Sequence, residues 1–271
     1  MIKSALDPFL ERRLESIETV DKQAFPPSTF DQPLSKKHSS AFSKSLKTNA
    51  KNSKPKVLAE VKKKSPSLGS LTEAKAIDLC KTFVEAGAHA ISVLVDQVHF
   101  NGHPQDLLDC KLQYQSTPFL YKDFVLTEYQ VHLASHIGAD SILLMTQVLD
   151  DQELEKLYQL SLSLGLEPFI EVHTYTQYER ALTLKPTIIG INARDFSTKG
   201  LPVHLNNAGK LLHTAKENNT LTTDIVMVAQ SGIDSPQSYT TVCEACPESL
   251  PDAVQVGSSI SSSGKVPNWL F

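Results

Sequence analysis

The chain has 271 residues, of which 41% are hydrophobic and 21% are charged, and its formal net charge is −4. This composition is that of a globular protein with enough apolar residues for a large core. The small negative charge gives no general reason to bind nucleic acid or an acidic membrane surface, so we expect neither partner. The chain has no run of about 18 apolar residues, the length of a membrane-spanning helix, and no secretory signal, so we expect a cytoplasmic protein.

The first segment, residues 1–53, differs in composition from the rest of the chain. It is rich in Ser, Lys and Gln, and it contains the helix-breaking run FPPS at 25–28. Apolar spacing predicts helical stretches at 5–20 and 39–48. Because the segment is too short and too polar to bury a core of its own, we predict an N-terminal helical extension packed on a domain formed by residues 54–271.

From residue 54 onward, short β-rich runs alternate with longer amphipathic stretches. The runs are VLAEVK (57–62), AISVLV (90–95), PFLYK (118–122), DSILLM (140–145), PFIEV (168–172), IIGIN (188–192), IVMVA (225–229) and AVQVG (253–257). Helices are expected between them, for example at 73–86, 127–137, 150–164 and 174–184. Eight such units favour an α/β fold, a (β/α)8 TIM barrel, over a doubly wound open sheet, which ordinarily uses fewer strands.

Charged residues stand at the predicted C-terminal ends of several strands. Side chains alternate along a strand, so Glu60 and Lys62 share a face with Leu58 and are predicted to point into the barrel mouth. The same alternation brings to this rim Lys122, Glu171, Asn192 and Arg194. One buried ion pair can be purely structural, but the whole set at the end where barrel enzymes carry their active sites indicates a site.

Two Gly-Ser sequences follow the last two strands of the predicted barrel. The seventh strand runs into Gln230-Ser231-Gly232 and the eighth into Gly257-Ser258-Ser259. Glycines let the backbone approach a phosphate, and these two loops commonly hold one in such barrels. We therefore predict a phosphate site at Gly232, Gly257 and Ser258. The nine histidines show no metal-ligand spacing beside the strand ends, so we expect no metal.

With these residues in view, the chain resembles the indole-3-glycerol-phosphate synthases from about residue 57 to 259. The matching pieces are AEVKKKSPSLG (59–69), AISVLVDQVHFNG (90–102), PFLYKDF (118–124), GADSILLM (138–145), LGLEPFIEVH (164–173), IIGINARDF (188–196) and VAQSGI (228–233). The order and spacing of the E-x-K-x-x-S-P-S and K-D-F elements are specific to this family. The resemblance implies a decarboxylating lyase of tryptophan biosynthesis that needs no cofactor. Its partner would be a small phosphorylated substrate, and we expect a monomer or a weak homodimer.

The resemblance also implies roles for the rim residues in converting 1-(o-carboxyphenylamino)-1-deoxyribulose 5-phosphate to indole-3-glycerol phosphate. Lys122 and Lys62 would be general acids and Glu171 the general base, with Glu60 and Asn192 orienting them. The substrate carboxylate would be held by Arg194, with Ser65 and Ser67 nearby. The rest of the substrate would be lined by Phe100, Phe124, Gln230 and Ser231. Its phosphate would be taken by Gly232, Gly257 and Ser258.

One departure from the family pattern leaves alternatives open. The family usually has Glu where this chain has Gln230, and an amide cannot accept a proton as a base. We expect Gln230→Glu to raise kcat or leave it unchanged. A phosphate-binding barrel without turnover would share the same features. A second alternative is a different phosphate-handling barrel enzyme, such as the isomerase one step earlier in tryptophan synthesis or the tryptophan synthase α subunit. Such an enzyme should use an Asp/Cys or Glu/Asp pair on other strands and should lack the two lysines.

Overall fold

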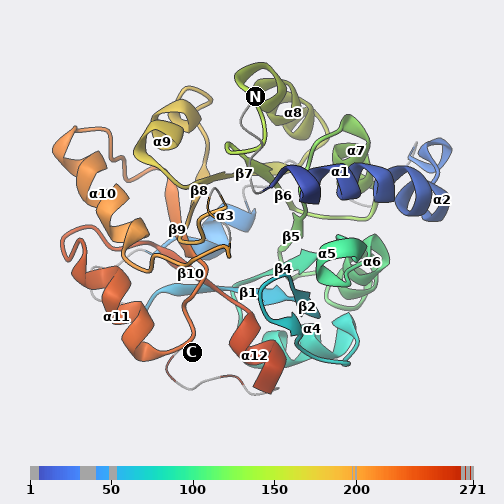
Figure 1. The fold of residues 1–271 in the computed structure, drawn as a ribbon, viewed down its shortest axis with the longest axis horizontal. Helices are drawn as coiled ribbons and strands as arrows, with labels where there is room; N and C mark the ends of the chain where they lie inside the picture. The colour runs from blue at the N-terminus through green and yellow to red at the C-terminus, as the bar shows by residue number, and fades with distance from the viewer. Residues whose placement is uncertain are drawn as a thin grey trace.

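The structure, a computed structural model, describes residues 6–30, 41–48, 54–196, 198, 200–263, 266 and 269. Within these residues, eight parallel strands close into a barrel in the order β1-β10-β9-β8-β7-β6-β5-β4, surrounded by helices (Figure 1). The strands are β1 (Lys56–Val61), β4 (Ala90–Leu94), β5 (Phe119–Lys122), β6 (Ser141–Met145), β7 (Glu167–Val172), β8 (Ile188–Asn192), β9 (Val226–Gln230) and β10 (Ala253–Val256). The predicted (β/α)8 TIM barrel is therefore confirmed.

Most of the helices that follow the strands start at a side-chain cap, namely α5, α6, α7, α8, α9 and α11. They are α4 (Ala76–Glu85), α5 (Gln97–Phe100), α6 (Pro104–Gln113), α7 (Glu128–His136), α8 (Asp151–Ser163), α9 (Tyr175–Leu182), α10 (Asn207–Glu217), α11 (Pro236–Glu244) and α12 (Ser258–Ser263). At α8, the Asp150 carboxylate accepts from the Glu153 N–H at 2.9 Å, and the Glu153 side chain accepts from the Asp150 N–H at 3.1 Å. Among the described helices, none combines the length and apolar character needed to cross a membrane.

The strands separate two apolar cores, as the alternation of their side chains predicts. Leu58, Leu120 and Phe169 belong to the cluster inside the barrel, whereas Val57 and Val61 belong to the cluster between the strands and the outer helices. All five side chains are almost fully buried. Because side chains alternate along each strand, the inward-facing residue that follows the interior core lies in the mouth of the barrel.

The N-terminal segment contacts both ends of the barrel. Its described elements are α1 (Asp7–Ser16), a π-helical turn (Ile17–Asp21), α2 (Lys22–Ala24), a 3-10 turn (Pro27–Thr29) and α3 (Ala41–Leu46). Both predicted helical stretches are present, although residues 5, 39 and 40 lie outside the described residues. In Figure 1, α3 projects onto the centre of the ring of strands, and α1 runs outward above the β5–β6 side. The division of the chain at residue 53 stays a prediction.

Helix α3 lies at the end of the barrel where the strands begin. The ring of Phe42 meets the ring of Phe169 edge to face, with centroids 6.3 Å apart. The backbone N–H of Ser43 donates to the carboxylate of Glu167, the first residue of β7, at 3.0 Å. Because Phe42 is fully buried in the interior cluster, α3 covers this end of the barrel, and the opposite end is left for a site.

Candidate active site

A cavity of about 480 Å³ opens at the C-terminal ends of the strands. It is lined by every residue predicted from the sequence for the site: Glu60, Lys62, Ser65, Ser67, Phe100, Lys122, Phe124, Glu171, Asn192, Arg194, Gln230, Ser231, Gly232, Gly257 and Ser258. The loops after β1, β4, β5, β8, β9 and β10 and the end of β7 all contribute. The volume suits a small molecule rather than a polymer.

Glu60 and Lys62 form a close ion pair at the end of β1. The Lys62 ammonium donates to Glu60 Oε2 at 2.6 Å, and the two side chains are 14% and 6% exposed, respectively. Burial raises the pKa of Glu60, but the positive charges of Lys62 and Lys122 lower it by a larger amount, so the net shift is downward. Glu60 is therefore held as a carboxylate, and Lys62 is held with its ammonium group in the mouth.

A second charged pair joins β5 to β7 across the cavity. Lys122 Nζ lies 3.7 Å from Glu171 Oε2, and the Asn192 amide donates to Glu171 Oε1 at 3.0 Å. The Asn192 side-chain oxygen in turn accepts from the Arg194 backbone N–H at 2.9 Å. Glu171 is 1% exposed, so its carboxylate is fixed by Asn192 and faces Lys122 within a desolvated site.

His173 and Phe196 extend this part of the site, and the sequence reasoning assigned neither. His173 Nε2 lies 3.8 Å from Glu171 Oε1, and the imidazole packs edge to face on Phe196 with centroids 5.6 Å apart. Burial lowers the pKa of His173, and the nearby Glu171 carboxylate only partly opposes this. A neutral imidazole therefore lies beside Glu171 near pH 7. The sequence could have indicated both residues, because His173 and Phe196 lie within the matched pieces LGLEPFIEVH and IIGINARDF.

Arg194 follows β8 and is held by backbone contacts. Its Nη1 donates to the Leu201 carbonyl at 3.0 Å, and its backbone forms an isolated antiparallel bridge with Val203. Burial lowers the pKa of Arg194 from its ordinary high value, while Glu60 raises it, and the guanidinium stays a cation at neutral pH. Arg194 thus supplies a fixed positive group that faces the cavity.

The loop after β1 forms a small hairpin that the sequence did not predict. Its strands are β2 (Lys64–Ser65) and β3 (Gly69–Ser70), paired antiparallel. The hydroxyl oxygens of Ser65 and Ser67 lie 3.1 Å apart, with Ser65 buried and Ser67 exposed. Both line the cavity on the side of Lys62, and so offer neutral hydrogen-bonding groups at its rim.

Two aromatic residues form an apolar wall. The rings of Phe100 and Phe124 lie with centroids 6.2 Å apart at an interplanar angle of 37°. Phe124 also meets His99 edge to face at 6.1 Å. Both phenylalanines belong to or pack on the interior apolar cluster, so the wall is continuous with the barrel core. Such a surface suits a planar aromatic ring of a ligand.

The Gly-Ser loops lie on the β9–β10 side of the cavity. Ser231 and Gly232 have φ angles of 69° and 76°, in the left-handed region that glycine adopts without strain. A Cβ atom at Gly257 would lie 2.7 Å from the Glu60 Cβ, so only glycine fits beside β1 there. Gly257 leads directly into α12, whose first turn presents backbone N–H groups. Both Gly-Ser loops therefore line the cavity at positions where glycine is required.

Gln255 is a further cavity-lining residue that the sequence reasoning missed. It stands on β10 between the two outward-facing valines, and its side chain points into the barrel interior. Its amide donates to Glu60 Oε1 at 2.9 Å and accepts from the Gln230 amide at 2.7 Å. The available signal was an amide at an inward position of an otherwise apolar strand, which is expensive unless hydrogen-bonded.

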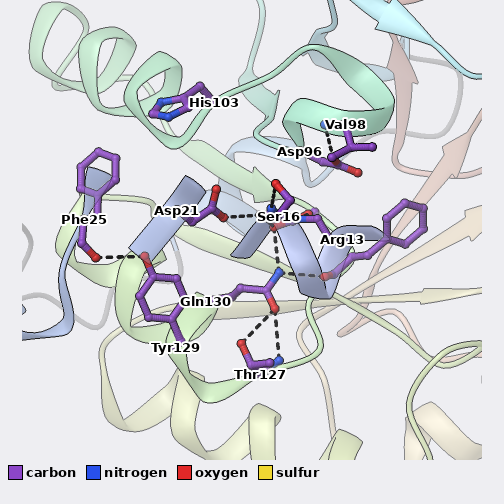
Figure 2. A network of polar contacts seen from close by, with 12 residues as sticks. Arg13, Ser16, Asp21, Phe25, Asp96, Val98, His103, Thr127, Tyr129 and Gln130 are labelled. Carbon is purple, nitrogen blue, oxygen red and sulfur yellow. Dashed lines mark hydrogen bonds and ion pairs between the residues drawn. The ribbon is translucent and has the colours of Figure 1, made fainter. Parts of the chain in front are cut away.

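Asp123 follows Lys122, and its carboxylate contacts α1. Its carboxylate receives two hydrogen bonds from Arg13, at 2.8 Å from Nε and 2.6 Å from Nη2, and one from Gln130 at 2.8 Å. Arg13 also pairs with Asp21 at 2.6 Å, and Figure 2 shows Arg13 among Ser16, Asp21 and Gln130. Because Arg13 and Asp123 are fully buried, α1 is anchored beside the strand end that carries Lys122.

The described residues contain no group of three or more His, Cys, Asp or Glu side chains placed to hold a metal ion. The cavity instead carries two lysine–glutamate pairs, Glu60 with Lys62 and Glu171 with Lys122, together with the Arg194 guanidinium. Groups of this kind transfer protons and stabilise charge that develops on a substrate.

The fold and the site define a (β/α)8-barrel enzyme with a cavity of paired charged side chains at the C-terminal ends of its strands. Residues 6–268 match the family model described as indole-3-glycerol phosphate synthase. The chain belongs to the indole-3-glycerol phosphate synthase family, the decarboxylating lyases of tryptophan biosynthesis.

Several curated proteins named indole-3-glycerol phosphate synthase are similar to the chain. The protein of Staphylococcus saprophyticus is 38% identical over 189 residues, which cover 70% of this chain and 69% of that protein. The protein of Carboxydothermus hydrogenoformans is 38% identical over 193 residues, or 71% and 70% of the two chains. That of Leptospira interrogans is 37% identical over 190 residues, or 70% and 72%.

Solved structures with lower sequence identity share the fold alone. The N-acetylmannosamine-6-phosphate 2-epimerase from Clostridium perfringens has a TM-score of 0.57 at 14% identity, covering 83% of this chain and 93% of that one. The thiamine phosphate pyrophosphorylase from Pyrococcus furiosus has a TM-score of 0.52 at 16% identity, covering 77% and 88%.

Proposed function

We propose that the chain catalyses ring closure, decarboxylation and dehydration of 1-(o-carboxyphenylamino)-1-deoxyribulose 5-phosphate, giving indole-3-glycerol phosphate, CO₂ and water. The observation that carries this proposal is the pair of lysine–glutamate contacts in one cavity, Lys62 with Glu60 at 2.6 Å and Lys122 with Glu171 at 3.7 Å. Membership of the family and the names of its relatives support the same reaction.

The first chemical step forms the five-membered ring. The ring carbon that bears the carboxylate attacks the ketone carbon of the ribulose chain, and Lys122 donates a proton to the oxygen that would otherwise become an alkoxide. Loss of CO₂ leaves its bonding electron pair in the ring and restores aromaticity. The position of Lys122 at the end of β5, 13% exposed and opposite Glu171, supports its role as this acid.

The second step removes water from the cyclised intermediate. Lys62 donates a proton to the departing hydroxyl group, and Glu171 accepts the proton that is lost as the double bond forms. Glu60 orients Lys62, and Asn192 orients Glu171 through its 3.0 Å hydrogen bond. The fixed carboxylate of Glu171, buried and bonded on one oxygen, supports a role as base.

Substrate binding uses the remaining residues of the cavity. Arg194, with Ser65 and Ser67 on the loop after β1, holds the carboxylate until it leaves as CO₂. The aromatic ring rests against Phe100 and Phe124, and Gln230 and Ser231 bound the sugar side of the cavity. The phosphate binds at Gly232, Gly257 and Ser258 through backbone N–H groups.

The decisive experiment is a fluorescence assay for indole formation with purified protein, using Lys122→Met as the comparison. We expect the wild type to form indole-3-glycerol phosphate. Lys122→Met should lose at least about 100-fold in kcat, because a general acid contributes about that much, while its fold and its affinity for inorganic phosphate are kept.

Two results would contradict this proposal in different ways. Full activity of Lys122→Met would remove Lys122 from the mechanism. Absence of product from the wild type, together with saturable binding of the substrate, would indicate a phosphate-binding barrel without turnover. Circular dichroism and thermal unfolding of both proteins serve as folding controls.

We also propose that residues 54–271 form the catalytic barrel and that residues 1–53 are an extension packed on it. The burial of Phe42 inside the barrel and of Arg13 against Asp123 supports this division. A cytoplasmic location and a monomeric or weakly dimeric state remain predictions.

A further inference from the structure

A continuous chain of hydrogen bonds crosses the floor of the cavity from β9 to β1. The Gln230 amide nitrogen donates to Gln255 Oε1 at 2.7 Å, and the Gln255 amide nitrogen donates to Glu60 Oε1 at 2.9 Å. The other carboxylate oxygen of Glu60 accepts from Lys62 at 2.6 Å. Gln230, Gln255 and Glu60 are 2%, 6% and 5% exposed, so the chain runs in the interior and excludes water.

The Glu60 carboxylate determines which groups donate and which accept along this chain of hydrogen bonds. Glu60 as a carboxylate has only acceptor oxygens, so Gln255 has to present its NH₂ group to it. The Gln255 carbonyl then faces Gln230, and residue 230 has to be a donor. An amide at position 230 satisfies this requirement, whereas an ionised carboxylate does not.

The barrel makes room for the first member of the chain. A Cβ atom at Gly190 of β8 would lie 2.1 Å from Gln230 Oε1 and 2.3 Å from Phe169 Cε1, so only glycine leaves space for the amide. Within the described residues, Gln230 Oε1 is buried and has no hydrogen-bond partner. The Gln230 amide therefore contributes through its NH₂ group, since its oxygen gains no hydrogen bond from the described residues.

We propose that Gln255 is a positioning residue that, supported by Gln230, fixes the Glu60 carboxylate and thereby the Lys62 ammonium group in the catalytic mouth. This inference rests on the proposed function for its catalytic meaning, but the contacts that carry it are independent of the substrate. Gln255 itself acts only through Glu60.

The charges around Glu60 show why a positioning residue is needed. Lys62 faces Glu60 from its own strand end, Lys122 from β5 and Arg194 from the segment after β8. With three cations within its electrostatic reach, the carboxylate has more than one possible partner. The hydrogen bond from Gln255 holds one oxygen, and the other is left to Lys62 alone.

This chain alters what is expected when residue 230 becomes acidic. In Gln230→Glu, the new carboxylate would face the Gln255 carbonyl, and turning the Gln255 amide would direct that carbonyl at Glu60 instead. Either arrangement places an acceptor against an acceptor in the interior. We therefore expect Gln230→Glu to lower kcat, contrary to the expectation from the sequence alone.

The first test is Gln255→Met, which keeps the length of the side chain and removes its polar atoms. We expect kcat for indole-3-glycerol phosphate formation to fall by about tenfold or more, the effect of losing a buried hydrogen bond to a charged group. KM should stay within about twofold, because Gln255 acts through Glu60. The matched control is Gln113→Met at the exposed C-terminal end of α6, which should leave both constants unchanged.

The second test is Gln255→Glu, which keeps the shape of the amide and decides the matter if Gln255→Met fails to fold. At high pH two carboxylates would oppose each other, whereas at lower pH one would be protonated and donate to Glu60 as the amide does. The kcat/KM of Gln255→Glu relative to wild type should therefore rise at least about fivefold between about pH 8.5 and about pH 6. A purely structural role would leave this ratio flat.

Each outcome bears on the proposal. Suppose that the wild-type enzyme is active. An unchanged kcat in Gln255→Met, or a kcat/KM of Gln255→Glu relative to wild type that does not change with pH, would then overturn the inference and leave the proposed function standing. An inactive wild type would overturn the proposed function. In that case ¹³C NMR titration of the Glu60 carboxyl group, assigned with Glu60→Gln, decides the inference. A higher pKa of Glu60 in Gln255→Met than in wild type supports it, and an equal pKa overturns it.

Discussion

At the scale of single residues, the mouth of the barrel keeps charged groups buried by pairing each with a specific partner. Glu60 is 5% exposed and yet ionised, because Lys62 and Lys122 more than offset the effect of burial on its pKa. Glu171 is similarly buried, with Asn192 on one oxygen and Lys122 near the other. The ionised groups that the proposed reaction needs therefore also affect the free energy of unfolding.

Glu60 should make the folded state sensitive to acid. Its pKa is lowered by folding, so its carboxylate stabilises the protein above the unfolded value of about 4.3, and this stabilisation is lost as the pH falls through the folded value. We expect the Tm of Glu60→Gln to be lower than that of wild type near neutral pH, with the difference shrinking below about pH 4. Thermal unfolding between about pH 7 and about pH 3 measures this.

The exposed Glu155 of α8 offers a matched control, since Glu155→Gln makes the same chemical change outside the site. Its Tm should follow that of wild type at every pH. A Tm difference for Glu60→Gln that stays constant down to about pH 3 would contradict the linkage.

At the scale of elements, α1 is attached to the barrel by an ion pair that lies entirely in the interior. Arg13 has 0% side-chain exposure and bonds both to Asp123 and to Asp21. Burial lowers the pKa of Arg13, but the two carboxylates raise it well above its ordinary value, so the guanidinium remains charged. Removing it would leave Asp123 buried without its cation.

We expect Arg13→Met to lower the free energy of unfolding by about 3–5 kcal/mol, the loss found when one partner of a buried ion pair is removed. Urea unfolding followed by circular dichroism measures this. Arg12 lies next to it on α1 and is exposed, so Arg12→Met should change stability by less than about 0.5 kcal/mol. Equal effects of the two substitutions would show that the buried pair contributes no more than a surface charge.

The same elements show how far the sequence could predict the structure. The alternation of Leu58, Glu60 and Lys62 is local, so the sequence alone predicts both the strand and the side to which its charged residues point. The contacts of Gln255 with Glu60 and of Arg13 with Asp123 join residues 195 and 110 positions apart. Local patterns do not specify which side chains meet across a closed barrel, so these partners had to come from the structure.

At the scale of the whole molecule, the proposed phosphate site lies where the barrel closes. β1 pairs with β10 to close the ring, and Gly257, at the end of β10, packs directly on Glu60. A phosphate bound at Gly232, Gly257 and Ser258 would thus add contacts at the closure between the first and last strands, in the folded state only.

We expect inorganic phosphate to stabilise the protein, by about 2.7 kcal/mol when present at about 100 times its Kd. Thermal unfolding in phosphate, compared with chloride at equal ionic strength, tests this. In Gly232→Ala the shift should be reduced, because a Cβ there would lie 2.6 Å from the Val203 side chain at a φ of 76°. An equal Tm rise in chloride would point to a general salt effect instead.

The placement of α1 and α3 at opposite ends of the barrel bears on the order in which the chain can fold. The Lys47 ammonium just beyond α3 donates to the Ile225 carbonyl at 3.2 Å and to the Asp252 carboxylate at 3.3 Å, at the starts of β9 and β10. Ile225 and Asp252 lie 178 and 205 positions after Lys47 in the chain, so the ribosome adds them much later. Lys47 can therefore make these contacts only after the last two strands have been synthesised, whereas Arg13 of α1 can reach Asp123 before them. Docking of the segment around Lys47 is thus expected to follow closure of the ring.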